Sequence, residues 1–314
     1  MNTKRIISLV ASLALVLSLS VGLTGCGDKA AQDDNQGSTD GEGTKYTVGI
    51  CQLVQHEALD AATQGFIDAL NEALPGQVEF QNKNASGDSA NCSTIVNGFV
   101  SDGVDLIMAN ATPALTAAVS ATKDIPILGT SITAYGVALD IADFSGTVGG
   151  NVSGTSDLAD LSAQAAMITE WFPDTKTVGL LFCSAEPNSR YQIEEVAKYL
   201  ADKGIESKEF AFTDTNDVTA VTQAAADYAD VIYIPTDNTA AANTEAIANV
   251  LIPAKVPAIC GEEGICSGCG VATLSISYYD LGVATGKMAY EILVNGADIA
   301  TMPVEFAPQF TKEY

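Results

Sequence analysis

The sequence predicts an α/β protein with two open lobes, each built on a parallel sheet, and three observations support this fold class. Short apolar runs alternate with amphipathic stretches along the chain, as in repeated β-α-β units. The apolar runs are nearly continuous, which is typical of strands covered on both faces. The alternation stops once, over residues 130–156, and then starts again. This interruption counts against a TIM barrel, which needs eight regular repeats.

The expected strands are the apolar runs, and the expected helices are the amphipathic stretches between them. The pattern is clearest at 106–108, 178–182 and 231–234. In chain order the expected strands are 46–51, 78–82, 104–109, 126–129, 177–182, 206–212, 230–234, 257–260 and 271–276. The expected helices are 57–73, 89–102, 113–121, 157–171, 188–203, 217–227, 238–250 and 279–294. Residues 130–156 are rich in Gly, Ser and Thr and show no clear helix.

The N-terminal segment has the layout of a bacterial secretory signal. Two basic residues at positions 4 and 5 precede an apolar run over 6–23, and a Thr-Gly pair leads into Cys26. This resembles a lipobox, so we expect removal of residues 1–25 and lipidation of Cys26 at the outer face of the cytoplasmic membrane. The alternative is a membrane-spanning anchor, because the apolar run is nearly long enough to span. Residues 26–44 are polar and Gly-rich, which predicts a flexible tether.

The net charge of −25 excludes nucleic acid as a partner, because such binding depends on Lys and Arg that neutralise phosphates. It also disfavours adsorption to anionic lipid head groups, so the expected link to the membrane is the lipid anchor. The chain holds six cysteines besides Cys26, at positions 51, 92, 183, 260, 266 and 269. Gly residues surround Cys266-Ser-Gly-Cys269, which favours a loop dithiol or a local disulfide over a metal or redox centre.

The motifs that would make the chain an enzyme are incomplete. His56 is the only histidine, and although it stands four residues before Asp60, a helical zinc site needs a second histidine. No Gly-x-Ser-x-Gly elbow, phosphate-binding loop or Gly-x-Gly-x-x-Gly fingerprint is present. The sequence therefore predicts neither catalytic residues nor a metal or cofactor.

Polar residues collect where the expected strands end, which is where parallel sheets bind ligands. In the first lobe these loops are 52–56, 82–88, 110–112 and 130–133, and in the second they are 184–189, 213–216, 236–238 and 261–263. Helix capping is the alternative role for each residue, because Ser, Thr, Asp and Asn are favoured caps.

Several sequence blocks carry a resemblance to a known family. They are Val48–Ile50, His56–Asp60, Gln64–Phe66, Asn110–Pro113, Thr122–Pro126, Gly149–Ser156, Pro235–Asn238 and Tyr278–Gly282. Together they resemble the ABC-transporter substrate-binding lipoproteins whose relatives take tryptophan or phenylalanine, from about Tyr46 to Val304. The resemblance implies the type I periplasmic-binding-protein fold, with two Rossmann-like lobes joined by three crossing segments that act as a hinge. The first lobe would span 45–153 plus about 278–296, and the second 154–277 plus about 297–314.

The resemblance also implies a function and a set of contacts. A monomer would capture an amino acid, with an aromatic one favoured, and deliver it to the permease and ATPase of an ABC importer. The ligand contacts carried over by position are His56, Asn84, Thr112, Ser131, Thr133, Ser184, Asn188, Asp237 and Glu262. Ala134-Tyr135 after Thr133, where relatives commonly have Asp-Pro, departs from the pattern.

The residue types in that set suit a zwitterion. Hydroxyls of Thr112, Ser131 and Thr133 could bind the carboxylate, whereas Asp237, or else Glu262, could bind the ammonium group. Tyr135, Phe144 or Tyr278 could offer a ring face to an aromatic side chain. Two other functions stay open: a sensor of the same fold that signals through a membrane partner, and a surface thiol-redox protein acting through Cys266 and Cys269.

Overall fold

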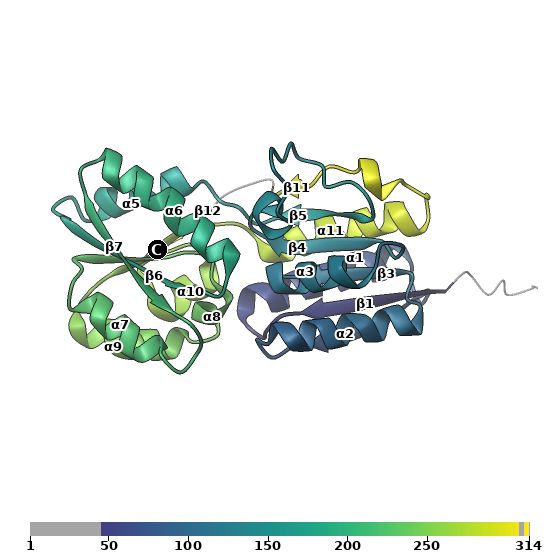
Figure 1. The fold of residues 1–314 in the computed structure, drawn as a ribbon, viewed down its shortest axis with the longest axis horizontal. Helices are drawn as coiled ribbons and strands as arrows, with labels where there is room; N and C mark the ends of the chain where they lie inside the picture. The colour runs from purple at the N-terminus through teal and green to yellow at the C-terminus, as the bar shows by residue number, and fades with distance from the viewer. Residues whose placement is uncertain (1–44, 308–310, 314) are drawn as a thin grey trace, which may run out of the picture. The chain divides into compact units, whose positions relative to one another are not determined.

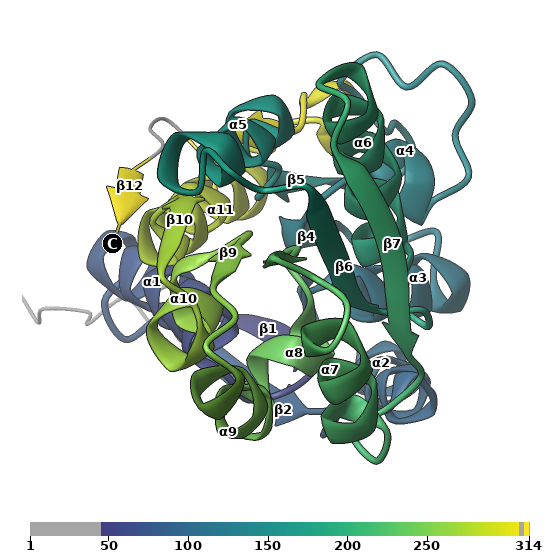
Figure 2. The ribbon, with the colours of Figure 1, turned by 90° about the vertical axis from the view of Figure 1, so that its left-hand side faces the viewer.

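The computed structural model describes residues 45–307 and 311–313, which form two lobes with one six-stranded sheet each. Nearly all strand pairs are parallel, and β12 pairs with β10 in the antiparallel sense. Figure 1 shows the two lobes, and Figure 2 looks onto the second one. The α/β class predicted from the sequence is confirmed.

The first sheet has the strand order β11-β5-β4-β3-β1-β2. Its strands are β1 (Tyr46–Gln52), β2 (Val78–Asn84), β3 (Leu106–Asn110), β4 (Ile127–Ile132), β5 (Val152–Ser156) and β11 (Glu305–Phe306). Its helices are α1 (Glu57–Ala73), α2 (Ser89–Asp102), α3 (Thr112–Ala121), α4 (Tyr135–Ala138), α11 (Tyr278–Leu293) and the 3-10 helix η1 (Ile299–Thr301). One apolar cluster lies under α2 and α3, and another lies under α1 and α11, so the sheet is covered on both faces.

The second sheet has the order β12-β10-β9-β8-β6-β7. Its strands are β6 (Thr177–Cys183), β7 (Glu206–Phe212), β8 (Val231–Ile234), β9 (Ala258–Cys260), β10 (Ala272–Ser275) and β12 (Thr311–Glu313). Its helices are α5 (Leu161–Trp171), α6 (Pro187–Asp202), α7 (Val218–Ala226), α8 (Asn238–Ala241), α9 (Thr244–Ala254) and α10 (Glu263–Cys269). In Figure 1, α5 and α6 lie above this sheet, and α7 and α9 lie below it, each pair over its own apolar cluster.

The chain passes between the two sheets three times: from β5 to β6, from β10 to α11, and from β11 to β12. The C-terminal segment differs from the expected division of the lobes. The resemblance places about 297–314 in the second lobe, but β11 pairs with β5 in the first sheet, and η1 packs there as well. Of that segment, β12 is the part that pairs with the second sheet.

Two glycines let α1 and α11 pack with their backbones in contact. A Cβ atom on Gly65 would clash with the carbonyl oxygen of Tyr279, and one on Gly282 would clash with that of Ala62. Because backbone atoms cannot move aside, these positions need glycine. The contact fixes α11, which follows the last parallel strand of the second lobe, onto the first lobe.

Several elements differ from the sequence-based expectations, among them the short α4, η1, β11 and β12, which the sequence pattern does not predict. Strand β5 was not expected, because Val-Ser-Gly-Thr-Ser holds one large apolar residue, yet all five residues are buried between β4 and β11. The helix expected over 238–250 is divided into α8 and α9. The Cys266-Ser-Gly-Cys269 motif lies in α10 and not in a loop.

Among the described residues, no helix is long and apolar enough to cross a membrane. The segment for which we expect a signal, and for which a membrane anchor is the alternative, lies outside the described residues.

Candidate functional site

A small polar cavity lies where the carboxyl ends of strands from both sheets meet the start of several helices. Its volume is about 10 Å³. It is lined by His56, Leu59, Ser131, Thr133, Asp157, Asn188, Thr236, Asp237, Asn238, Ala241, Glu262 and Tyr278. Ligand sites in open parallel sheets occupy this position, and we refer to this cavity as the cleft.

Six of the nine residues expected to bind ligand line the cleft: His56, Ser131, Thr133, Asn188, Asp237 and Glu262. The structure places the other three elsewhere. Asn84 is exposed, and its Oδ1 accepts a hydrogen bond from the backbone N–H of Ser86 at 2.7 Å. Thr112 is buried at the start of α3 and does not line the cleft.

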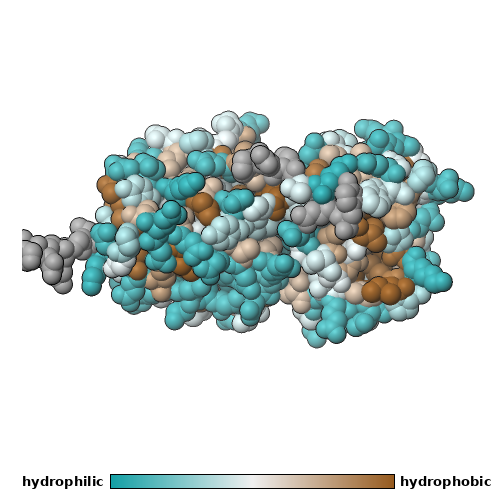
Figure 3. Space-filling view, turned by 180° about the vertical axis from the view of Figure 1, so that it is seen from behind, coloured by the Kyte–Doolittle hydropathy of each residue, from teal (hydrophilic) through white to brown (hydrophobic). Residues whose placement is uncertain are grey.

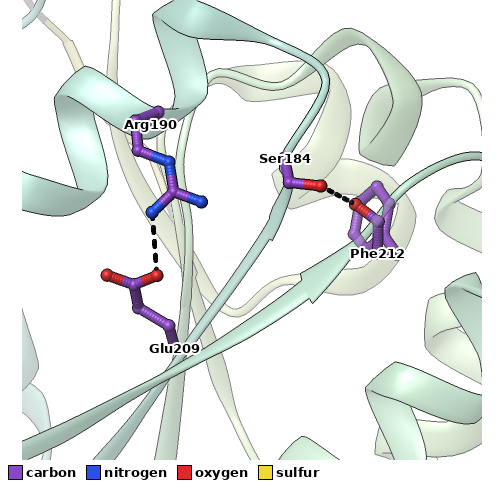
Figure 4. A network of polar contacts seen from close by, with 4 residues as sticks. All are labelled: Ser184, Arg190, Glu209 and Phe212. Atoms are coloured by element: carbon purple, nitrogen blue, oxygen red, sulfur yellow. Dashed lines mark hydrogen bonds and ion pairs between the residues drawn. The ribbon is translucent and has the colours of Figure 1, made fainter.

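Ser184 is the third residue outside the cleft. It is exposed, and its hydroxyl donates to the carbonyl oxygen of Phe212 at 3.1 Å (Figure 4). Arg190, the one arginine near the expected cleft loops, pairs with Glu209 on β7 at 2.9 Å in the same view. Its guanidinium also lies 4.7 Å from the ring centre of Phe182. Arg190 therefore faces the outer side of the second lobe and offers no positive charge to the cleft.

The cleft gathers polar atoms that have no hydrogen-bond partner. Six buried side-chain N or O atoms of the described residues lack a partner, and four of them belong to cleft residues. These four are His56 Nδ1, Ser131 Oγ, Asp157 Oδ1 and Asn188 Oδ1. Each buried polar atom left unsatisfied costs about 1–3 kcal/mol, so such a group of atoms at one place needs polar partners, which water or a polar ligand can supply.

Three of these four atoms are hydrogen-bond acceptors: a carboxylate oxygen of Asp157, Asn188 Oδ1 and His56 Nδ1. Neighbouring contacts show this for Asn188 and His56. The amide nitrogen of Asn188 donates to the carbonyl of Thr236 at 3.2 Å, which leaves its Oδ1 as the free atom. The amide nitrogen of Asn238 donates to Glu186, so its Oδ1 faces His56 Nε2 at 3.3 Å. His56 Nε2 therefore donates, and in the neutral ring Nδ1 is an acceptor. Burial lowers the pKa of His56, which favours that neutral ring.

Three carboxylates in the cleft are strongly desolvated. Burial raises the pKa of Asp237 to about 8 and that of Glu262 to about 7. Burial also raises the pKa of Asp157, although contacts with the side chains of Thr133 and Tyr278 oppose the shift, and Tyr278 Oη donates to Asp157 Oδ2 at 3.0 Å. A positive ligand group would reverse these shifts, because an opposite charge favours the ionised form.

Among these three carboxylates, Asp157 is the one with an oxygen that lacks a hydrogen-bond partner. Both oxygens of Asp237 and both oxygens of Glu262 already accept hydrogen bonds. Asp237 accepts from the N–H of Ala240 at 2.8 Å and of Cys183 at 2.6 Å, and so caps α8. Glu262 accepts from the second and third residues after it and caps α10. The capping role weighed against ligand contact is thus observed for both residues.

Sequence reasoning missed Asp157, and it did not single out Asn238 or Glu186 as site residues. Asp157 directly follows β5, so the strand-end rule would have found it if 152–156 had been recognised as a strand. Glu186 is buried beside the cleft, where it accepts hydrogen bonds from the backbone N–H groups of Asn238 and Thr239. Asn238 in turn links the second lobe to His56 in the first.

Of the three aromatic residues considered for a ring contact, Tyr278 lines the cleft. Tyr135 and Phe144 stack on each other, with ring centres 6.3 Å apart, and line a separate apolar pocket of about 610 Å³, to which Tyr191 of α6 also contributes. The Tyr135 hydroxyl donates toward the carbonyls of Gly129 and Thr155, which holds that ring away from the cleft. The apolar pocket shares Thr133 with the cleft.

Within residues 45–307 and 311–313, no group of three or more His, Cys, Asp or Glu side chains is placed to hold a metal ion. Asp60, the residue four positions after His56, instead accepts a hydrogen bond from Gln52 Nε2 at 2.6 Å.

Comparison with known proteins gives the family. Residues 47–312 match the family model described as ABC transporter substrate binding protein. A tyrosine-binding protein of Clostridioides difficile (strain R20291) is 34% identical over 312 residues, which cover 96% of this chain and 88% of that protein.

Solved structures agree with that match. A Streptococcus pneumonia ABC domain in complex with L-Trp is 32% identical, with a TM-score of 0.82 over 86% of this chain and 91% of that one. The ligand-free, open structure of a Clostridium difficile substrate binding protein with adhesive properties is 34% identical, with a TM-score of 0.64 over 85% and 91%. A leucine binding protein of Thermotoga maritima shares the fold, with a TM-score of 0.60 at 11% identity over 81% and 84%. The chain therefore belongs to the ABC transporter substrate binding protein family.

Proposed function

We propose that this protein captures a zwitterionic aromatic L-amino acid in the cleft, which at about 10 Å³ must widen to admit it, acting as a binding protein and not as an enzyme. The observation that carries the proposal is the set of four unpartnered polar atoms, of which three are acceptors. An ammonium group has three N–H donors, which matches acceptors at Asp157, Asn188 and His56. The hydroxyl of Ser131 remains as a donor for the ligand carboxylate.

The names of two relatives support the ligand class. One is called a tyrosine-binding protein, and another was solved with L-Trp. In the cleft of this chain, the apolar side chains of Leu59 and Ala241 and the ring of Tyr278 stand beside the polar ones. We infer that Asp157, whose Oδ1 has no partner, is the main contact of the ligand ammonium group. Asp237 and Glu262 would add negative charge from their positions as helix caps.

The experiment is a binding screen on protein freed of carried-over ligand by unfolding and refolding. We expect L-tyrosine, L-tryptophan or L-phenylalanine to raise the melting temperature. A ligand at a hundredfold excess over its Kd stabilises the fold by about 2.7 kcal/mol. N-acetyl-L-tyrosine, which lacks the ammonium group, serves as the matched control and should not bind. If none of the standard amino acids stabilises the protein, or if the acetylated control binds equally well, the proposal is wrong.

We further propose that the protein works outside the cytoplasm as a lipid-anchored monomer and delivers its ligand to the permease and ATPase of an ABC importer. Family membership supports the transporter partner, and the Thr-Gly-Cys26 sequence supports the anchor, although residues 1–44 lie outside the described residues. A Cys26→Ser variant should neither incorporate radioactive palmitate nor lose residues 1–25. Palmitate labelling of that variant would contradict lipidation at Cys26.

A further inference from the structure

Three thiols lie close together near the C-terminal end of α10. Cys260 ends β9, and Cys266 and Cys269 lie in α10. Cys266 and Cys269 pack against the apolar cluster that contains Cys260, and the nearness of both thiols, together with burial, raises the pKa of Cys260 well above its usual value. The contact depends on Gly270, because a Cβ atom at that position would clash with Cys260 Sγ.

The three thiols differ in their access to solvent. Cys260 is fully buried, whereas Cys266 and Cys269 are half-buried. Cys269 lines an open pocket of about 500 Å³, formed with the end of α9 and the residues after α10. Figure 3 shows hydrophobic residues on the back of the second lobe, which is the side that carries α9 and α10 in Figure 2. Of the three residues, Cys269 is the one that lines this pocket, so an external disulfide would approach it before the fully buried Cys260.

A second thiol pair in the first lobe gives an internal comparison. Cys51 on β1 and Cys92 on α2 are in hydrogen-bond contact, and both are fully buried. None of the six described cysteines is in a disulfide. Because exchange needs access as well as a thiolate, the pair in α10 should react with an external disulfide in the folded protein, and the Cys51–Cys92 pair should not.

Helix α10 also connects the thiols to the cleft. Its first turn is held by Glu262, whose carboxylate accepts from the N–H groups of Gly264 at 2.7 Å and Ile265 at 2.5 Å. One turn later, the Cys269 thiol contacts the carbonyl oxygen of Ile265 at 3.3 Å. A covalent bond between Cys266 and Cys269 would remodel the last turn of this seven-residue helix, and Glu262 is the cleft residue tied to the same helix.

We propose that Cys266 and Cys269 form a thiol–disulfide pair whose oxidation state changes ligand affinity through α10 and Glu262. The Cys269 thiolate attacks one sulfur of an external low-molecular-weight disulfide, forms a mixed disulfide and releases one thiol. The Cys266 thiolate then attacks the Cys269 sulfur and releases the second thiol. The protein loses two protons and two electrons, and the external disulfide is reduced to two thiols. Cys260, whose thiol lies 4.0 Å from the carbonyl oxygen of Ala258, stays protonated and takes no part in the exchange.

The first test maps the bond and needs no ligand. The folded protein is treated with oxidised glutathione, its remaining thiols are alkylated under denaturing conditions, and it is digested with a protease that cuts after Glu. Cleavage after Glu262 or Glu263 separates Cys260 from the pair. We expect Cys51, Cys92, Cys183 and Cys260 to be alkylated, and Cys266 and Cys269 to share one disulfide that dithiothreitol reverses. A fragment that remains joined to Cys260, or alkylation of both Cys266 and Cys269, would overturn the assignment.

The second test, which rests on the proposed function, compares L-tyrosine affinity in the reduced and oxidised protein by calorimetry. Since loss of a helix cap commonly costs about a factor of five, we expect roughly three- to tenfold weaker binding after oxidation. A Cys266→Ser/Cys269→Ser double variant should bind equally well with and without oxidised glutathione. Equal affinity of the two forms of the natural protein would refute the link to the cleft. If neither form binds L-tyrosine, the proposed ligand class is wrong. The disulfide map would still test the thiol pair, because it does not depend on ligand binding.

Discussion

Replacing Asp157 with asparagine tests the ammonium site with almost no change in side-chain shape. Asp157 is 4% exposed, its Oδ2 accepts from Tyr278 Oη at 3.0 Å, and its Oδ1 has no partner. Asparagine can keep the bond from Tyr278 through its own oxygen, but it presents an NH₂ group and no charge to the ligand. Removing one partner of a buried charge pair costs about 2–5 kcal/mol of binding free energy. We therefore expect L-tyrosine to bind roughly 30- to 4,000-fold more weakly.

The same substitution should stabilise the protein that holds no ligand. Burial raises the pKa of Asp157 above its unfolded value, so the carboxyl stabilises the fold at low pH and loses that contribution as the pH rises through the folded pKa. At neutral pH, asparagine avoids the desolvated charge, and the melting temperature should stay equal or rise.

The assay for Asp157→Asn is calorimetric titration with L-tyrosine, together with a thermal melt without ligand. Asp160→Asn is the matched control, because Asp160 is an exposed residue of the same crossing segment whose Oδ1 caps α5 and lies outside the cleft. The control should bind L-tyrosine normally. Unchanged affinity in Asp157→Asn, or an equal loss in both variants, would refute the charge-pairing argument.

Three further predictions concern other cleft residues and one residue outside the cleft. Asp237→Asn should lower stability by about 1–3 kcal/mol in denaturant melts, because its NH₂ group would face the N–H of either Ala240 or Cys183; a variant as stable as the natural protein would contradict this. The pKa values of Asp237 (about 8) and Glu262 (about 7) are raised, so the melting temperature without ligand should fall from pH 5 to 8 while the affinity for L-tyrosine rises. A melting temperature and an affinity that change in the same direction with pH would contradict this reasoning. Ser184→Ala should leave affinity unchanged in calorimetry, since that hydroxyl bonds outside the cleft, and a tenfold loss would return Ser184 to the site.

The strand-end rule explains both the success and the main failure of the sequence analysis at the site. Thr133 and Asp237 follow strands whose apolar runs are visible in the sequence, Ser131 lies near the end of one, and all three line the cleft. Asp157 follows β5, a strand that is buried by its neighbours but contains mostly small polar residues. Its burial comes from long-range pairing with β4 and β11, which no local pattern in the sequence reports.

The Cys266-Ser-Gly-Cys269 segment shows a similar limit of local propensity. Three glycines around the motif favour a loop, since glycine is a poor helix former. The helix forms because Glu262 accepts two backbone N–H groups and Ile265 is fully buried in the core of the second lobe. Tertiary contacts of this kind outweigh a penalty of about 1 kcal/mol per glycine.

The cleft's negative charge also suggests how ligand chemistry and lobe closure are coupled. His56 and Thr133 come from the first lobe, and Asn188 and Asp237 come from the second, so a ligand touches the full set only when both lobes surround it. Enclosing the carboxylates without a cation carries the desolvation cost that raises their pKa values. An ammonium group offsets this cost in the closed arrangement and has little to offset in an open, hydrated one. A ligand shifts a conformational equilibrium only by its difference in affinity for the two states. The cleft carboxylates that would select the proposed zwitterion would therefore also favour closure of the two lobes around it.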